Sequence, residues 1–240
     1  MFGVLLLHTL GSTNLEFKEL EEYLQDQGFR TISPLLPGHG TSPNDLKNYT
    51  YRDWLQASER ALKDLDCQVT FLVSQITGVP LALTLASYHP EFLGIVTISG
   101  IISLPRWYSR FISFFRNSRM VSWGSPISKL LPLDDPVIGE KIAMYKEIPQ
   151  LALNETFSLI KQSRKLLNKV NQPIYIFHSS TRKEFNIRNA HFLFENVSSK
   201  KKKLMFIEKG SPLMSVDVTR HILFRESTTF FWSCIDLYQM

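Results

Sequence analysis

The chain has 240 residues, of which 44% are hydrophobic and 20% charged, with a net charge of +5. This length and composition suit a globular protein with one large core. The two cysteines, Cys67 and Cys234, are far apart, which excludes a disulfide framework and favours a reducing, cytoplasmic compartment. The apolar N-terminus is too short to span a membrane and lacks the features of a signal peptide, so we interpret it as a strand.

Strands and helices alternate through the first hundred residues. Their short apolar runs are typical of strands covered on both faces, as in parallel sheets. We expect the acidic residues after Asn14, namely Glu16, Glu19 and Glu22, on a solvated helix face. The predicted elements are a strand at 3–8, a helix capped by Asn14, a strand at 29–33, a loop at 34–43, a helix capped by Thr50, a strand at 69–73, a turn at 74–78, a helix to about Tyr88 and a strand at 93–99.

The alternation breaks between about residues 104 and 171. This stretch is rich in aromatic residues and predicts two helical segments, near 137–145 and 152–167. We interpret it as a helical cap over the carboxyl edge of the sheet, where ligands bind in such folds. Its aromatic residues pack the cap, line an apolar cleft, or do both: Trp107, Phe111, Phe114 and Phe115.

The alternation then resumes with a strand at 174–178, a helix at 187–197, a strand at 204–207 and a final helix from 216 to about 235. The four lysines at 200–203 are interpreted as part of a solvated loop before a strand. The other interpretation, a patch for nucleic acid or anionic lipid, lacks a recognisable binding motif, so no nucleic-acid partner is expected. The pattern predicts a single α/β domain over 1–240, with the insert at about 104–171.

Several segments, in the right order, resemble the carboxylesterase and monoacylglycerol lipase group of α/β-hydrolases. The resemblance extends from Gly3 to about Ile235 and implies a mostly parallel twisted sheet with helices on both faces and a helical cap, without a cofactor. The turn at 74–78 stands where this fold carries its nucleophile elbow, G-x-S-x-G. The matching segments are 3–8, 36–43, 51–54, 144–145 with 148–149, and 171–178.

In register with that family, the three catalytic positions hold side chains that cannot do the chemistry. A hydroxyl nucleophile, a carboxylate and a histidine are required. The positions read Ile76 for the nucleophile, Arg182 for the acid and Pro212 for the histidine. The family's His-Gly-aromatic oxyanion loop reads His8-Thr9-Leu10, and the amides of Leu10 and Thr77 take the oxyanion-donor positions. The resemblance therefore implies the scaffold of an esterase without its triad.

The replacement at Ile76 also has a conformational consequence. A nucleophile in this turn has a positive φ, which costs a β-branched residue about 1–3 kcal/mol. Either the turn has relaxed, or Ile76 is held there under strain. Ser74 and Thr77 flank the tip, and Ser211 lies beside the histidine position; local hydrogen bonding is the favoured role of the first two and a turn position that of Ser211.

Three functional hypotheses follow. The first is a catalytically silent protein that binds an apolar or acyl small molecule or a protein partner. The second is an enzyme that uses the remaining cleft and the oxyanion amides without a serine nucleophile. The third is residual ester hydrolysis by a displaced nucleophile. No H-x-x-x-H or C-x-x-C spacing is present, so no metal site is expected.

Overall fold

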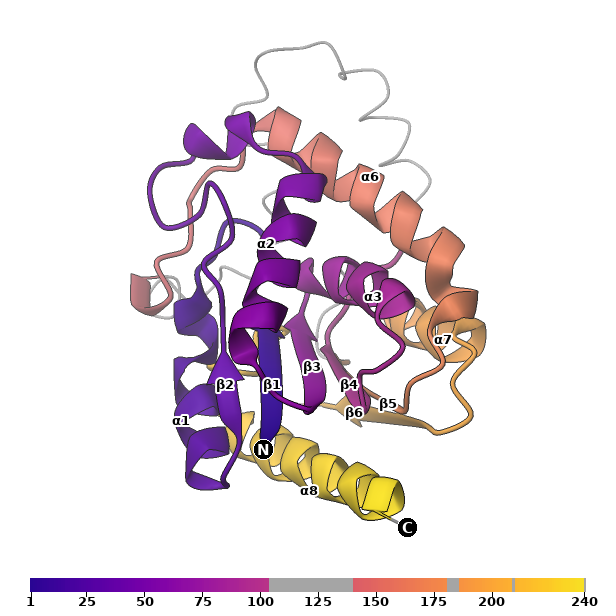
Figure 1. Cartoon of the computed structure of the whole chain (residues 1–240). Helices are drawn as coiled ribbons and strands as arrows, with labels where there is room; N and C mark the ends of the chain where they lie inside the picture. The colour runs from indigo at the N-terminus through magenta and orange to yellow at the C-terminus, as the bar shows by residue number, and fades with distance from the viewer. Residues whose placement is uncertain (104–139, 181–185, 209, 240) are drawn as a thin grey trace.

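The computed structural model describes residues 1–103, 140–180, 186–208 and 210–239. In this part of the chain six parallel strands form one twisted sheet in the order β2-β1-β3-β4-β5-β6 (Figure 1). The strands are β1 (Phe2–Leu7), β2 (Arg30–Ile32), β3 (Val69–Gln75), β4 (Gly94–Ile98), β5 (Ile174–Ser179) and β6 (Lys202–Ile207). The expected mostly parallel sheet is confirmed, and the strand predictions agree with it to within about two residues.

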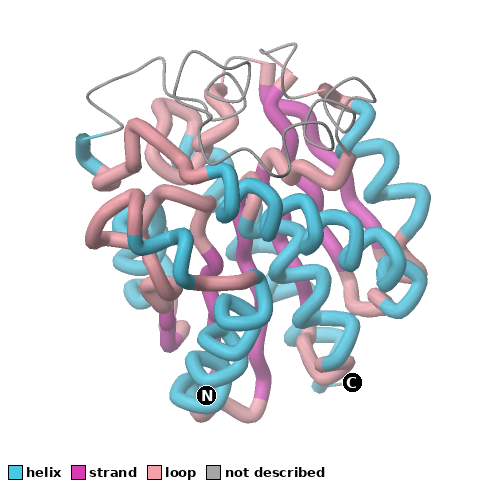
Figure 2. Tube along the Cα trace, turned by 90° about the horizontal axis from the view of Figure 1, so that it is seen from above, coloured by secondary structure: helices cyan, strands magenta, loops and turns pink. Residues whose placement is uncertain are grey.

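Helices cover both faces of the sheet, as Figure 2 shows from above. One face carries α1 (Lys18–Asp26) and α8 (Arg220–Gln239), which share an apolar cluster. The other face carries α2 (Tyr51–Leu65), α3 (Gly78–Tyr88), α6 (Gln150–Leu166) and α7 (Arg188–Asn196). Short 3₁₀ turns lie at η1 (Asn14–Phe17), η2 (Asp45–Asn48) and η4 (Leu167–Lys169).

The central strands are apolar along their whole length because both of their faces are covered. In β3, Leu72 faces the α2 and α3 side, whereas Phe71 and Val73 face the α1 and α8 side, and all three side chains are fully buried. Each such side chain contributes about 1.5–3 kcal/mol by leaving water. This burial fixes the register of β3 between β1 and β4, and with it the position of the turn that follows.

The helix starts follow from capping chemistry. The prediction for Thr50 is confirmed, because Thr50 and Asp53 form a capping box in which the Asp53 carboxylate accepts the Thr50 N–H at 2.8 Å. The prediction for Asn14 is wrong. Thr13 caps η1 by accepting the Leu15 N–H at 3.3 Å, whereas the Asn14 amide donates to the carbonyl of Ser33.

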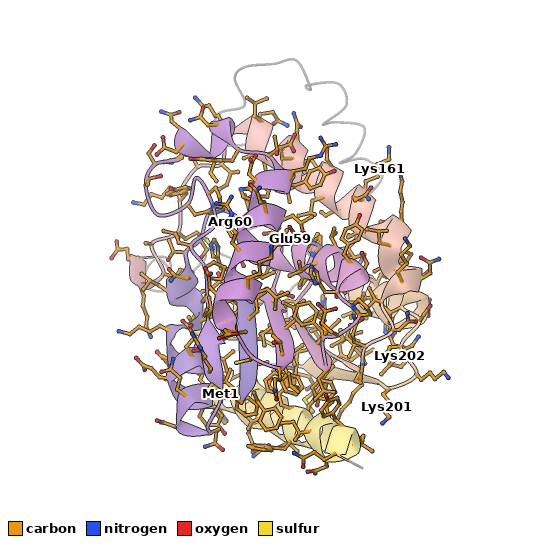
Figure 3. The ribbon with its side chains drawn as sticks, viewed as in Figure 1. Met1, Glu59, Arg60, Lys161, Lys201 and Lys202 are labelled. Atoms are coloured by element: carbon orange, nitrogen blue, oxygen red, sulfur yellow. The ribbon has the colours of Figure 1, made fainter. Side chains whose placement is uncertain are left out.

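The lysine run is partly inside the sheet. Lys202 and Lys203 belong to β6, so this strand begins two residues earlier than predicted. The Lys202 ammonium donates to the carbonyls of Phe194 and Val197 at the end of α7, at 2.8 and 2.7 Å, which satisfies helix-terminal acceptors. Lys201 and Lys202 lie beside this edge of the sheet (Figure 3). The run thus serves the fold through Lys202, while Lys200 and Lys201 are exposed.

The C-terminal half of the expected cap is described, and residues 104–139 lie outside the described residues. The predicted helix at 152–167 is α6, which packs across α3 above the carboxyl edge of the sheet (Figure 1). Of the segment predicted as helical near 137–145, Glu140 and Lys141 are helical and residues 142–143 form a turn, while residues 137–139 lie outside the described residues. No helix in the described ranges is long and apolar enough to cross a membrane.

Candidate functional site

The turn between β3 and α3 keeps a strained conformation at its tip. Ile76 has φ of +50°, the left-handed region that a β-branched residue rarely adopts. Its N–H donates to the carbonyl of Ile98 at 2.8 Å, and its carbonyl accepts the N–H of Ile101 at 3.2 Å. Of the two expected outcomes, the strained turn is therefore the one observed. The hydrogen bonds to the end of β4 hold it in place against a cost of about 1–3 kcal/mol.

Gly78 explains how closely this turn approaches the end of β1. A Cβ atom at position 78 would lie 2.3 Å from the carbonyl oxygen of Leu7 and 2.7 Å from that of His8. Only glycine permits such an approach of helix to strand. The first turn of α3 therefore lies directly against the loop that follows β1, and it brings Thr77 beside Leu10.

The side chain of Ile76 is fully buried in an aliphatic cluster that fills the space above the turn. The cluster contains no group that can attack a carbonyl or transfer a proton. It draws on the loop after β4, the segment before α6, α6 itself and the loop after β6, and its other members are Ile101, Ile142, Met144, Ile160, Leu213 and Val216. Side chains of the protein thus occupy the volume beside Ile76.

Of the two amides expected to face an oxyanion, that of Leu10 already has a hydrogen-bond acceptor within the protein. The N–H of Leu10 donates to the hydroxyl oxygen of Thr77 at 2.7 Å, a short bond in a partly buried position. Thr77 therefore has a structural partner, but the prediction of hydrogen bonding to the local backbone is wrong for it, because Leu10 is 67 positions away in the chain. The hydroxyl of Ser74 is buried on the strand below and has no hydrogen-bond partner among the described residues.

The loop after β6 holds the position expected for a histidine. Pro212 is buried there, between Gly210 and Leu213. The Ser179 hydroxyl donates to the carbonyl of Gly210 at 2.5 Å, and the Ser211 N–H donates to the carboxylate of Asp217. These bonds fold the loop back on itself and keep Pro212 inside. The expected acid position, Arg182, and the cap aromatics Trp107, Phe111, Phe114 and Phe115 lie outside the described residues.

The segment before α6 is fastened to the loops around the turn. The Tyr145 N–H donates to the carbonyl of Gly11 at 2.6 Å. The Tyr145 hydroxyl donates to the carbonyl of Gly38 at 3.1 Å and accepts the N–H of Thr41 at 2.8 Å. Ile142 joins from the same segment, since its carbonyl accepts the Thr13 hydroxyl at 2.8 Å. The segment therefore closes over the aliphatic cluster as part of the packed structure.

A small cavity of about 10 Å³ lies behind the oxyanion loop, room for about one water molecule. His8 and His39 both line it, with ring centroids 4.8 Å apart. Burial, with a smaller effect of His39, lowers the pKa of His8 to about 3, and burial lowers the pKa of His39 to about 4. His8 Nε2 accepts the Leu36 N–H at 3.1 Å, which ties the two loops together, and the lowered pKa values keep both rings neutral at pH 7.

Glu16 is the residue that the sequence pattern misplaced. It is fully buried rather than on a solvated helix face. Its carboxylate accepts the N–H of Thr9 at 2.9 Å and the Thr9 hydroxyl at 3.3 Å, so it supports the oxyanion loop from below. Burial raises the pKa of Glu16 to about 8, although hydrogen bonds from its neighbours oppose this shift. It therefore carries a proton at neutral pH.

No cluster of metal-ligating side chains occurs among the described residues, and both cysteines are free thiols. In the described part of the site, the aliphatic cluster thus surrounds a strained turn, and buried polar groups lie beneath it. Such a surface can pack against apolar groups, but it offers no nucleophile at the tip.

No protein-family model matches the chain. It is 27% identical over 232 residues to the thermostable monoacylglycerol lipase of Bacillus sp. (strain H-257), a match that covers 95% of this chain and 90% of the lipase. Among solved structures, that reported for LipS and LipT, two metagenome-derived lipolytic enzymes, has a TM-score of 0.84 at 23% identity, over 97% of this chain and 94% of that chain. The monoacylglycerol lipase of Paleococcus ferrophilus has a TM-score of 0.79 at 16% identity, with the same coverage. The chain therefore has the α/β-hydrolase fold and is similar to monoacylglycerol lipases and esterases.

Proposed function

We propose that this protein is a catalytically silent, lipase- and esterase-like α/β-hydrolase that acts by binding. The observation that carries the proposal is Ile76, which stands at the tip of the elbow turn with φ of +50° and is fully buried among aliphatic side chains. A hydrolase of this fold needs a hydroxyl at this tip. In the family register, Arg182 and Pro212 take the places of the carboxylate and the histidine, so all three roles of the triad are unfilled.

Two further observations weigh against a displaced nucleophile. The Thr77 hydroxyl accepts the N–H of Leu10, and Ser74 is buried on the strand below the tip. A hydroxyl becomes a nucleophile only beside a base that takes its proton. His8 and His39 are neutral, but His8 Nε2 already accepts an amide N–H, and His39 is buried behind the loop. We therefore prefer binding to residual hydrolysis.

The bound molecule is proposed to be an apolar or acyl small molecule, or a protein partner. The relative from Bacillus is a monoacylglycerol lipase, which makes lipids with an acyl chain the first small molecules to test. The aliphatic cluster around Ile76 gives such a chain a matching surface, provided that the segment carrying Ile142 and Met144 moves. Native mass spectrometry of protein purified from its own cell would detect either a retained lipid or a retained partner.

Catalytic silence has a direct test. The native protein is incubated with a fluorophosphonate probe and, separately, with monoacylglycerols and p-nitrophenyl esters of increasing chain length. We expect no labelling and no turnover above the rate of the heat-denatured protein. Labelling of a single residue in the native protein, at a site mapped by mass spectrometry, would overturn the proposal and favour a displaced nucleophile.

The assignment of the triad positions is tested by restoring them. The variant Ile76→Ser, Arg182→Asp, Pro212→His should gain fluorophosphonate labelling at position 76 if the register is right. The matched control carries Ile76→Ala with the other two changes, so that it has the same base and acid but no hydroxyl. Labelling of both variants at a different residue would contradict the assigned register.

A further inference from the structure

We propose that Thr77 is an internal plug of the oxyanion site. Its hydroxyl occupies the Leu10 amide and excludes an acyl oxygen from it, in the chain as folded. The inference rests on the proposed function for the assignment of the Leu10 amide as an oxyanion donor. The observation is the bond itself: the Leu10 N–H donates to Thr77 Oγ1 at 2.7 Å. An amide has one hydrogen, so an N–H held at this distance is not available to a ligand oxygen.

The backbone leaves Thr77 little freedom to withdraw. Gly78, the next residue, is pressed against the carbonyl oxygens of Leu7 and His8, and Ile76, the residue before, is bonded to the end of β4. Threonine is β-branched and therefore stiff at χ1. The hydroxyl of Thr77 is thus presented to Leu10 by the same close approach that forms the turn.

The bond also gives the Leu10 N–H an acceptor, without which its burial would destabilise the fold. Leu10 as a whole residue is 5% exposed, so this part of the loop has little access to solvent. A buried N–H without a partner is strongly disfavoured. In an active hydrolase the developing oxyanion meets this need during the reaction. Here the Thr77 hydroxyl accepts this hydrogen bond in the resting protein. The bond stabilises a loop conformation in which a substrate carbonyl oxygen cannot bind to the Leu10 N–H.

Hydrogen exchange of the Leu10 amide tests the plug without reference to catalysis. In Thr77→Val, which keeps the shape but removes the acceptor, we expect the Leu10 amide to exchange at least about tenfold faster in NMR measurements. Thr77→Ser keeps a hydroxyl and should restore the slow exchange. Thr84→Val is the matched control, because the Thr84 hydroxyl bonds to the Pro80 carbonyl further along α3. Unchanged exchange in Thr77→Val, or equal acceleration in Thr84→Val, would overturn the inference.

A second arm uses the restored variant, Ile76→Ser, Arg182→Asp, Pro212→His. Adding Thr77→Val should raise the turnover number for p-nitrophenyl butyrate by about 10²-fold, the effect of one oxyanion donor. Equal turnover with and without Thr77→Val would overturn the plug. If neither variant turns over but the exchange of the Leu10 amide responds as expected, the triad register of the proposed function fails, and the plug stands on the exchange result.

Discussion

Replacing Glu16 with glutamine should stabilise the protein at neutral pH. The Glu16 carboxyl is fully buried, and burial raises its pKa from 4.5 to about 8. In the unfolded chain at pH 7 this group is ionised, so folding must take up a proton. The free-energy cost follows from the difference between pH 7 and the unfolded pKa, 2.5 units at about 1.4 kcal/mol each, or about 3–4 kcal/mol. Glutamine resembles the protonated acid in shape and has no proton to take up.

The direction of the pKa shift determines the pH range over which Glu16 changes the stability of the protein. Because the folded pKa lies above the unfolded one, the stability that Glu16 contributes is fully present below pH 4.5 and is lost as the pH rises to about 8. The advantage of Glu16→Gln should therefore be near its minimum at pH 4 and grow by about 1.4 kcal/mol per unit up to pH 8. Urea unfolding of both proteins at pH 4, 5.5, 7 and 8 measures it.

Glu19 provides a control of opposite sign. It pairs with Lys141 and Arg220, and the hydrogen bond from Lys141 is the largest influence in lowering its pKa. Glu19→Gln should therefore lose stability as the pH rises through the acid range, whereas Glu16→Gln gains it. A free-energy difference for Glu16→Gln that does not change with pH, or that favours the wild type at pH 7, would refute the reasoning.

Three further outcomes are expected. Ile76→Ala should lower the free energy of unfolding by about 2–4 kcal/mol in urea titration, because the cavity left in the aliphatic cluster outweighs any relief of strain; a loss below 1 kcal/mol would speak against tight packing there. Tyr145→Phe should cost about 1–3 kcal/mol and speed exchange of the Thr41 amide, which loses its acceptor; unaltered exchange would count against the bond. His8 and His39 have folded pKa values of about 3 and about 4, below their ordinary 6.5, so the contribution of each ring to stability should fall by about 1.4 kcal/mol per unit as the pH drops from 6.5 towards 4. Because Glu16 changes stability in the opposite direction over this range, the effect is measured as the difference in unfolding free energy between the wild type and His8→Gln or His39→Gln. A difference that does not change with pH would contradict the burial of these rings as neutral groups.

The sheet could be read from the sequence because its signals are local. Uninterrupted apolar runs such as the one in β3 mark strands covered on both faces, and Thr50 with Asp53 marks a helix start. The sequence pattern predicts that the last helix begins at Val216, whereas α8 begins at Arg220. The residues between form turns closed by Leu213 and Asp217 carbonyls, which an apolar pattern does not distinguish from a first helical turn.

The site was harder to predict, because its contacts join residues far apart in the chain. Glu16 has the spacing of a solvated helix face, but the chain packs Thr9 and the end of β3 over it. The bond from Leu10 to Thr77 spans 67 positions, and nothing in the local sequence indicates it. The tip at Ile76 was predictable only as a choice between two conformations, since the hydrogen bonds that decide it come from the strand beside it.

Ile76 adopts the left-handed conformation although its own side chain is not a nucleophile. Two backbone bonds to residues 98 and 101 and the tight contact at Gly78 hold that geometry. The elbow is consequently a property of the surrounding scaffold and not of the amino acid placed at its apex. A designer could treat position 76 as a preformed mount, on which cysteine, aspartate or an unnatural side chain would be presented at the same angle.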